Sequence, residues 1–124
     1  DLTEAKAYEE TIAYLQSSPA PDVVYCENDN MCFGVMQALD ELGIAYGDGG
    51  VTLISFDAGR TALSYCKDGK IDLCAECNPL HGPRVRALIE QLARGETPEK
   101  LSYMPEALFT ADTLTAELLE SRVY

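Results

Sequence analysis

Two polar side chains follow two short apolar runs, and they are the residues of this sequence best suited to bind a ligand. Asn28 comes after the run 23–26, at the start of an apolar pattern with helical spacing, and Asp57 comes directly after the run 51–56. An asparagine amide both donates and accepts hydrogen bonds, and an ionised carboxylate accepts them. An amide and a carboxylate at two strand ends predict a site that faces one polar ligand.

These side chains need a scaffold that brings strand ends together, and the periodicity of apolar residues predicts one. Helical and extended patterns alternate, which is typical of a largely parallel sheet with crossover helices, an α/β fold. We predict helices at 2–16, 29–42, 61–67, 79 or 83 to 94, and 111–121, strands at 22–26, 51–56 and 71–77, and an extended segment at 101–109. Ligands of open α/β sheets bind beyond the carboxyl ends of strands, so we expect Asn28 and Asp57 to face a shared crevice.

Both residues also have a purely local explanation. Asn28 suits a turn at the start of a helix, and Asp57 suits the N-cap position of the helix that follows it. Asp29 is expected to cap the helix that begins beside it rather than to contact a ligand. The last helix is predicted to begin at Thr110 or Asp112.

The composition is that of a globular domain with a strong negative charge. The 124 residues are 47% hydrophobic, and 21 acidic residues against 9 basic ones give a net charge of −12. This length suits one hydrophobic core and is too short for two lobes. The charge repels nucleic acid phosphates, so we expect no nucleic acid partner. No apolar run approaches the roughly 20 residues of a membrane-spanning helix.

The five cysteines and the single histidine do not predict a catalytic or metal site. Four of the cysteines lie in apolar patterns and are expected to be buried as small hydrophobic residues: Cys26, Cys32, Cys66 and Cys74. Cys74 and Cys77 are spaced like a metal or redox pair, but no second pair accompanies them, and a strand would point them to opposite faces. His81 has no nucleophile or carboxylate constellation nearby. We therefore predict no enzyme activity, no metal and no cofactor.

The motifs at the strand ends resemble those of a known family. The order is Asn28-Asp29-x-Met31-x-x-Gly34, then Ala38-Leu39, a second strand, Phe56-Asp57, and Glu76 with Pro79 and Gly82. It resembles the sugar-binding fold of type I periplasmic binding proteins. The segments 95–100 and 108–110 and the acidic end of the chain are most similar to the galactofuranose-binding group of ABC-transporter receptors, which is close to the ribose-binding group.

The resemblance implies a lobe of the type I periplasmic binding protein fold that is incomplete at its amino terminus. Residues 1–124 would be the carboxyl-terminal portion, and 71–99 would normally cross to the missing amino-terminal lobe. Asn28, Asp57 and Glu76 would hydrogen-bond a monosaccharide such as a furanose, Glu76 from a position beside the hinge. The protein would be the non-enzymatic solute receptor of an ABC importer, with the membrane permease as its partner.

The same resemblance implies a periplasmic or extracellular location with a lipoprotein anchor. It also predicts that the fragment self-associates, because the absent strand would leave a sheet edge and apolar surface uncovered. The alternative is the ligand-sensing domain of a lactose-repressor-type transcription regulator, which shares the fold. A helix-turn-helix upstream would identify the regulator, and a signal peptide or lipobox would identify the receptor. An α/β enzyme of flavodoxin-like topology would need a phosphate-binding loop, which the sequence lacks.

Overall fold

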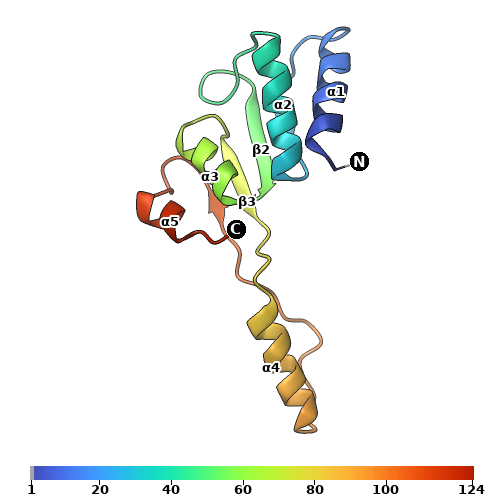
Figure 1. Ribbon diagram of the computed structural model, residues 1–124, viewed down its shortest axis with the longest axis vertical. Helices are drawn as coiled ribbons and strands as arrows, with labels where there is room; N and C mark the ends of the chain where they lie inside the picture. The colour runs from blue at the N-terminus through green and yellow to red at the C-terminus, as the bar shows by residue number, and fades with distance from the viewer. Residues whose placement is uncertain (1) are drawn as a thin grey trace.

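The computed structural model describes residues 2–124 and has the predicted alternation of helices and strands (Figure 1). The elements are α1 (Glu4–Leu15), β1 (Val23–Tyr25), α2 (Asp29–Glu41), β2 (Thr52–Asp57), α3 (Arg60–Lys67), β3 (Leu73–Glu76), α4 (Gly82–Ala93), β4 (Leu108–Phe109) and α5 (Ala116–Ser121). The strands form one sheet in the order β1-β2-β3-β4. The first three are parallel and β4 is antiparallel to β3, so the predicted α/β class is confirmed.

The alternation of side chains along the strands gives the sheet one buried face and one open face. Leu53 and Ser55 of β2 are fully buried, where α2 packs on β2 and α3 packs on β3. On the opposite face Val23 and Tyr25 are 51% and 61% exposed, and the Tyr25 ring contacts the Phe56 ring with centroids 5.0 Å apart. Parallel sheets usually carry helices on both faces. Here α1 packs on α2 instead, so the second face remains open.

The contact between α1 and α2 depends on a glycine. A Cβ atom at Gly34 would lie 2.1 Å from the main-chain oxygen of Glu4 and 2.9 Å from the main-chain nitrogen of Tyr8. The two helix backbones therefore approach more closely than any side chain would allow. The Tyr8 hydroxyl reinforces this packing with a hydrogen bond of 2.5 Å to the Glu41 carboxylate.

The carboxyl-terminal part of the chain differs from the prediction. Residues 111–113 form a turn rather than helix, because the Thr113 hydroxyl binds the main chain of Thr110. The last helix, α5, begins only after Thr115, whose side chain caps it by accepting a hydrogen bond from the Leu118 nitrogen. Neither Thr110 nor Asp112 is the cap, so that prediction was wrong. The extended segment forms only the two-residue strand β4.

Helix α4 projects away from the rest of the molecule (Figure 1). It has no buried residue, and three of its apolar side chains, Val85, Ile89 and Leu92, are 50%, 60% and 60% exposed. The connections to β3 and β4 run side by side toward it. No helix within residues 2–124 has the length and apolar character needed to cross a membrane.

The cysteines lie where their apolar surroundings predict. Cys26, Cys32, Cys66 and Cys74 are buried, with at most 2% of their surface exposed, whereas Cys77 is exposed. The thiol partner Cys26 and burial both raise the pKa of Cys32, which keeps this thiol neutral. A thiol must ionise and be reached by the reagent in order to react.

We therefore expect Ellman's reagent to modify one thiol in the native protein and five in urea. The Cys77→Ser variant should leave no fast-reacting thiol before unfolding. Rapid modification of two or more thiols in the folded protein would contradict the burial of the other four.

Candidate functional site

The carboxyl ends of β1, β2 and β3 lie at one edge of the sheet. Tyr25 is in register with Ile54, and the Cys26 nitrogen donates to the Ile54 oxygen at 2.8 Å. The ends of β1 and β2 are therefore neighbours, as the sequence predicts. Asp57 and Glu76 are register partners across β2 and β3. The sequence did not predict that these two acidic residues would lie opposite each other on adjacent strands.

Asn28 lies at this edge as the N-cap of α2. Its Oδ1 accepts a hydrogen bond of 2.8 Å from the Met31 nitrogen, and its Nδ2 donates to the Leu2 oxygen at 3.3 Å. The local explanation for this residue, a helix-start Asn, is thus confirmed, and Asp29 is not the cap. An amide oxygen has two lone pairs and an amide nitrogen two hydrogens. Within residues 2–124, one lone pair and one hydrogen of the Asn28 amide have no partner.

Asp57 is the last residue of β2 and has an unusual backbone. Its φ is 94° and that of Ala58 is 57°, a left-handed pair of residues without glycine. Such conformations cost about 1–3 kcal/mol each, and they persist only where their surroundings hold them. The N-cap of α3 is Gly59, so the expectation that Asp57 caps this helix was wrong. The side chain is exposed, and within residues 2–124 no hydrogen bond or ion pair engages its carboxylate.

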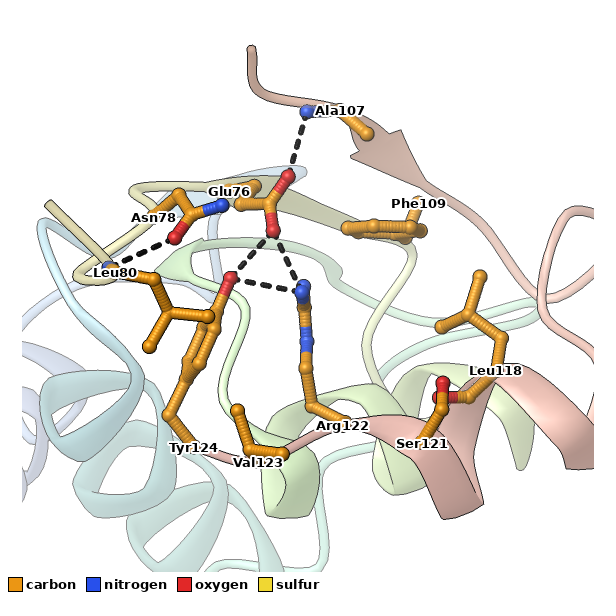
Figure 2. Close-up of a pocket in the computed structure, with 10 residues that line it drawn as sticks. All are labelled: Glu76, Asn78, Leu80, Ala107, Phe109, Leu118, Ser121, Arg122, Val123 and Tyr124. Carbon is orange, nitrogen blue, oxygen red and sulfur yellow. Dashed lines mark hydrogen bonds and ion pairs between the residues drawn. The ribbon is translucent and has the colours of Figure 1, made fainter. Parts of the chain in front are cut away.

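Glu76 ends β3 inside a dense polar network (Figure 2). Its Oε1 accepts hydrogen bonds from Arg122 Nη1 at 2.6 Å and from the Tyr124 hydroxyl at 2.5 Å, and its Oε2 accepts one of 3.0 Å from the Ala107 nitrogen. Burial opposes ionisation, but the hydrogen bonds from Tyr124 and Arg122 outweigh it and lower the pKa of Glu76. The carboxylate is therefore ionised and held in one orientation.

Arg122 was missed by sequence reasoning, although it is central to this network. Its guanidinium lies between the rings of Tyr124 and Phe109, with Cζ 4.4 Å and 5.1 Å from their centroids. Within residues 2–124 its Nη2 atom is buried and has no hydrogen-bond partner. A lone basic residue near the acidic end of the chain, two positions before Tyr124, was the only signal for it, and that signal is weak.

Asp29, the first residue of α2, connects this helix to β2 and to the residue before α3. Its carboxylate accepts a hydrogen bond of 2.5 Å from the Ser55 hydroxyl and one of 2.7 Å from the Gly59 nitrogen. Only 8% of Asp29 is exposed, and this burial raises the pKa of its carboxyl. Asp29 is structural, as expected, but it joins distant segments rather than capping its own helix.

A pocket of about 390 Å³ adjoins the network (Figure 2). Its lining residues are Glu76, Asn78, Leu80, Ala107, Phe109, Leu118, Ser121, Arg122, Val123 and Tyr124. Neither Asn28 nor Asp57 is among them. Asp57 and Glu76 thus lie opposite each other at the sheet edge, and Asn28 lies one strand away, after β1. The Glu76 carboxylate points toward Arg122 and Tyr124 at the end of the chain (Figure 2).

The chain is similar in sequence and structure to sugar-binding proteins. Residues 1–94 match the periplasmic binding protein domain family. The chain is 30% identical over 97 residues to the fructose import binding protein FruE of Bifidobacterium longum (strain NCC 2705), covering 78% of this chain and 29% of that protein. It is 33% identical over 97 residues to the galactofuranose-binding protein YtfQ of Escherichia coli (strain K12), covering 77% and 30%.

A solved structure extends the similarity to most of the fold. It is a Mycobacterium smegmatis protein in complex with β-D-fucofuranose, with a TM-score of 0.81 and 30% identity over 90% of this chain and 36% of that chain. The chain spans less than a third of the length of the two curated relatives. The matched family, the relatives and the parallel sheet with polar strand ends agree, and the chain belongs to the periplasmic binding protein domain family.

Proposed function

We propose that this chain is the carboxyl-terminal part of a receptor that binds a monosaccharide for an ABC importer. The observation that carries the proposal is the exposed carboxylate of Asp57, which has no partner among residues 2–124 and is held by a left-handed backbone at the end of a parallel strand beside Glu76. Ligands of such sheets bind at this edge. The relatives bind fructose, galactofuranose and fucofuranose, which favours a furanose ligand.

In this proposal the three predicted residues share the ligand contacts. Asp57 accepts two sugar hydroxyls in charge-assisted hydrogen bonds, which are about twice as strong as neutral ones. Asn28 uses its remaining lone pair and hydrogen. Glu76 faces the sugar from beside the hinge, with its orientation fixed by Arg122 and Tyr124. Within residues 2–124 none of the three is hydrogen-bonded to a serine, threonine, cysteine or lysine side chain, and we propose binding without catalysis.

The exposed apolar side chains of the projecting helix α4 favour the presence of a second, amino-terminal lobe that covers them. α4 leaves Val85, Ile89 and Leu92 exposed, and an apolar stripe on a helix must be covered to stabilise it. We propose that residues 71–99 cross into that lobe, where α4 packs. Closure of two lobes through a hinge would then surround the sugar, and the permease would recognise the closed form. The open sheet face would be covered in the same protein, and would favour self-association of this chain alone.

One relative named above is a fructose import binding protein and another a galactofuranose-binding protein, and nothing within residues 2–124 favours the transcription-regulator alternative. An importer receptor works outside the cytoplasmic membrane, and we propose a periplasmic or extracellular protein with a lipid anchor.

Calorimetric titration of the complete two-lobed receptor with pentoses and hexoses tests this proposal. We expect saturable binding, and about 10- to 100-fold weaker binding in Asp57→Asn, because a hydrogen bond to a charged group contributes about 1.5–3 kcal/mol. Asp48→Asn is the matched control, since Asp48 is exposed in the loop before the amino end of β2. Residues 1–124 alone should bind poorly, because one lobe leaves half of the sugar in water.

Two results would contradict the proposal. One is equal affinity of Asp57→Asn and Asp48→Asn for every sugar that binds. The other is micromolar or tighter binding by the isolated chain as a monomer, which would show that a second lobe is not needed.

A further inference from the structure

One side chain from the end of the sequence contacts the ends of two central strands. Arg122 donates from Nη1 to Glu76 Oε1 at 2.6 Å, at the end of β3, and from Nε to the Ala58 oxygen at 3.1 Å, directly after β2. Its guanidinium also lies against the Phe109 ring of β4. Arg122 thus connects three neighbouring strands at the edge where Asp57 lies.

The bond to Ala58 falls on the strained part of the backbone. Asp57 and Ala58 have left-handed φ angles, and residues other than glycine need support from outside to keep such angles. The Ala58 oxygen is held by Arg122, and the next residue donates its main-chain nitrogen to the Asp29 carboxylate. Arg122 is therefore one of two side chains that fix the conformation from which Asp57 projects.

Arg122 binds Glu76 at the point where the hydrogen bonds between the segments of β3 and β4 change from main chain to main chain, to main chain to side chain. The Glu76 nitrogen donates to the Ala107 oxygen at 2.9 Å, but the return bond from the Ala107 nitrogen goes to the Glu76 carboxylate. The next bond, from the Asn78 nitrogen, likewise goes to a carboxylate, that of Glu106. The two connections to α4 are joined by acidic side chains here, and Arg122 holds the first of them.

The tail that carries Arg122 is itself fixed to the start of α3. Arg60 donates through its side chain to the oxygens of Arg122 and Glu120, and its main-chain nitrogen donates to the Tyr124 oxygen at 2.7 Å. The side chains of Arg122 and Glu76 are 11% and 8% exposed. Removing one member of a buried ion pair leaves the other charge uncompensated.

We propose that Arg122 is a positioning residue, which joins the end of β2 at Ala58 to the end of β3 at Glu76 and so fixes Asp57 and Glu76 relative to each other. It acts through these two residues and does not touch the ligand. The consequence for sugar affinity rests on the proposed function, whereas the connection of the strand ends does not. Arg122 would then fix both the relative positions of Asp57 and Glu76 and the place where the two connections to α4 begin.

The first test measures the connection itself in the complete receptor. Carbon-13 NMR titration of the Glu76 carboxyl should show a higher pKa in Arg122→Gln than in the wild type, because the burial remains while the ion pair is lost. Hydrogen exchange of the Ala107 amide, which donates to this carboxylate, should become faster. Arg94→Gln removes an exposed arginine that is paired with Glu96, and is the matched control with no expected change.

Two milder variants keep the test decisive if Arg122→Gln folds poorly. Tyr124→Phe removes the hydroxyl group that donates to Glu76 and accepts from Arg122 Nη1, and it should raise the same pKa while the ring remains against Arg122. Arg122→Lys keeps the charge but not the forked donor geometry. It should preserve the low pKa of Glu76 and still lose the bond to Ala58.

Sugar titration of the same variants separates positioning from a structural role. We expect Arg122→Gln and Arg122→Lys to bind about tenfold or more weakly, because hydrogen bonds to a charged group contribute about 1.5–3 kcal/mol. Wild-type affinity in Arg122→Lys, with affinity lost in Asp57→Asn, would overturn the positioning role and leave the proposed function intact. An unchanged Glu76 pKa in Arg122→Gln would overturn the inference outright. If no sugar binds the wild type, the proposed function fails, and the pKa and exchange data still decide whether Arg122 joins the strand ends.

Discussion

Replacing Gly34 with alanine is expected to destabilise the protein by about 2–3 kcal/mol, at the upper end of the cost of overpacking. The added methyl group would lie 2.1 Å from the main-chain oxygen of Glu4, and no rotamer change can move a main-chain atom. Alanine is otherwise favoured over glycine in a helix by about 1 kcal/mol, so the sign depends on the contact between α1 and α2. Urea unfolding gives the free energy, and hydrogen exchange in α1 locates the loss.

Gly82 provides a matched control for this substitution. It begins α4, and a Cβ atom there would meet no other atom within 4 Å. Gly82→Ala should therefore leave the stability unchanged or raise it slightly. If Gly34→Ala is as stable as Gly82→Ala, the close packing of α1 on α2 is wrong.

Replacing Asp29 with alanine is expected to cost about 2–4 kcal/mol of unfolding free energy. The Ser55 hydroxyl is fully buried and donates to Asp29, and the Gly59 nitrogen donates to the other carboxylate oxygen. Both donors would lose their acceptor, and each unsatisfied buried group costs about 1–3 kcal/mol. Urea unfolding of the variant measures the loss. A loss below 1 kcal/mol would mean that water or another group replaces the carboxylate.

Asp29→Asn should be milder and should change how stability depends on pH. An amide can accept from the Gly59 nitrogen and donate to the Ser55 oxygen. Burial raises the pKa of Asp29, so the folded state binds this proton more tightly than the unfolded state does. Its contribution to stability is therefore fully present below the ordinary pKa of aspartate, and is lost as the pH rises through the folded pKa. We expect Asp29→Asn to lack this dependence in urea unfolding over a range of pH.

Predictions from local patterns agree with the structure where short-range interactions decide it. The first three strands and the helices between them follow from periodicity. Asn28 caps α2 through a hydrogen bond to Met31, which is only three residues away in the sequence. The alignment of strand ends follows from parallel pairing alone. That these residues contact a sugar stays a prediction, because their hydrogen bonds within the chain do not decide it.

The remaining features depend on contacts between distant parts of the sequence. Glu76 and Arg122 are separated by 46 residues, and no pattern around either one indicates the other. Asp29 bonds to residues 26 and 30 positions away, so its burial could not be inferred from its place at a helix start. The late start of α5 depends on a threonine side chain that competes with the helix for main-chain groups.

The spatial order of the strands, which is also their order in the sequence, has a consequence for how the protein is made. As the chain emerges from the ribosome, β2 and β3 each find the preceding strand already synthesised, 29 and 19 residues earlier in the sequence. Contacts between residues near in sequence form fastest, because little loop entropy is lost in closing them. Strand β4 pairs with β3 across 35 residues, and Arg122 bonds to Glu76 across 46 residues. We therefore expect folding in stages that follow synthesis, in which the first three strands assemble first and Arg122 fixes the ends of β2 and β3 last.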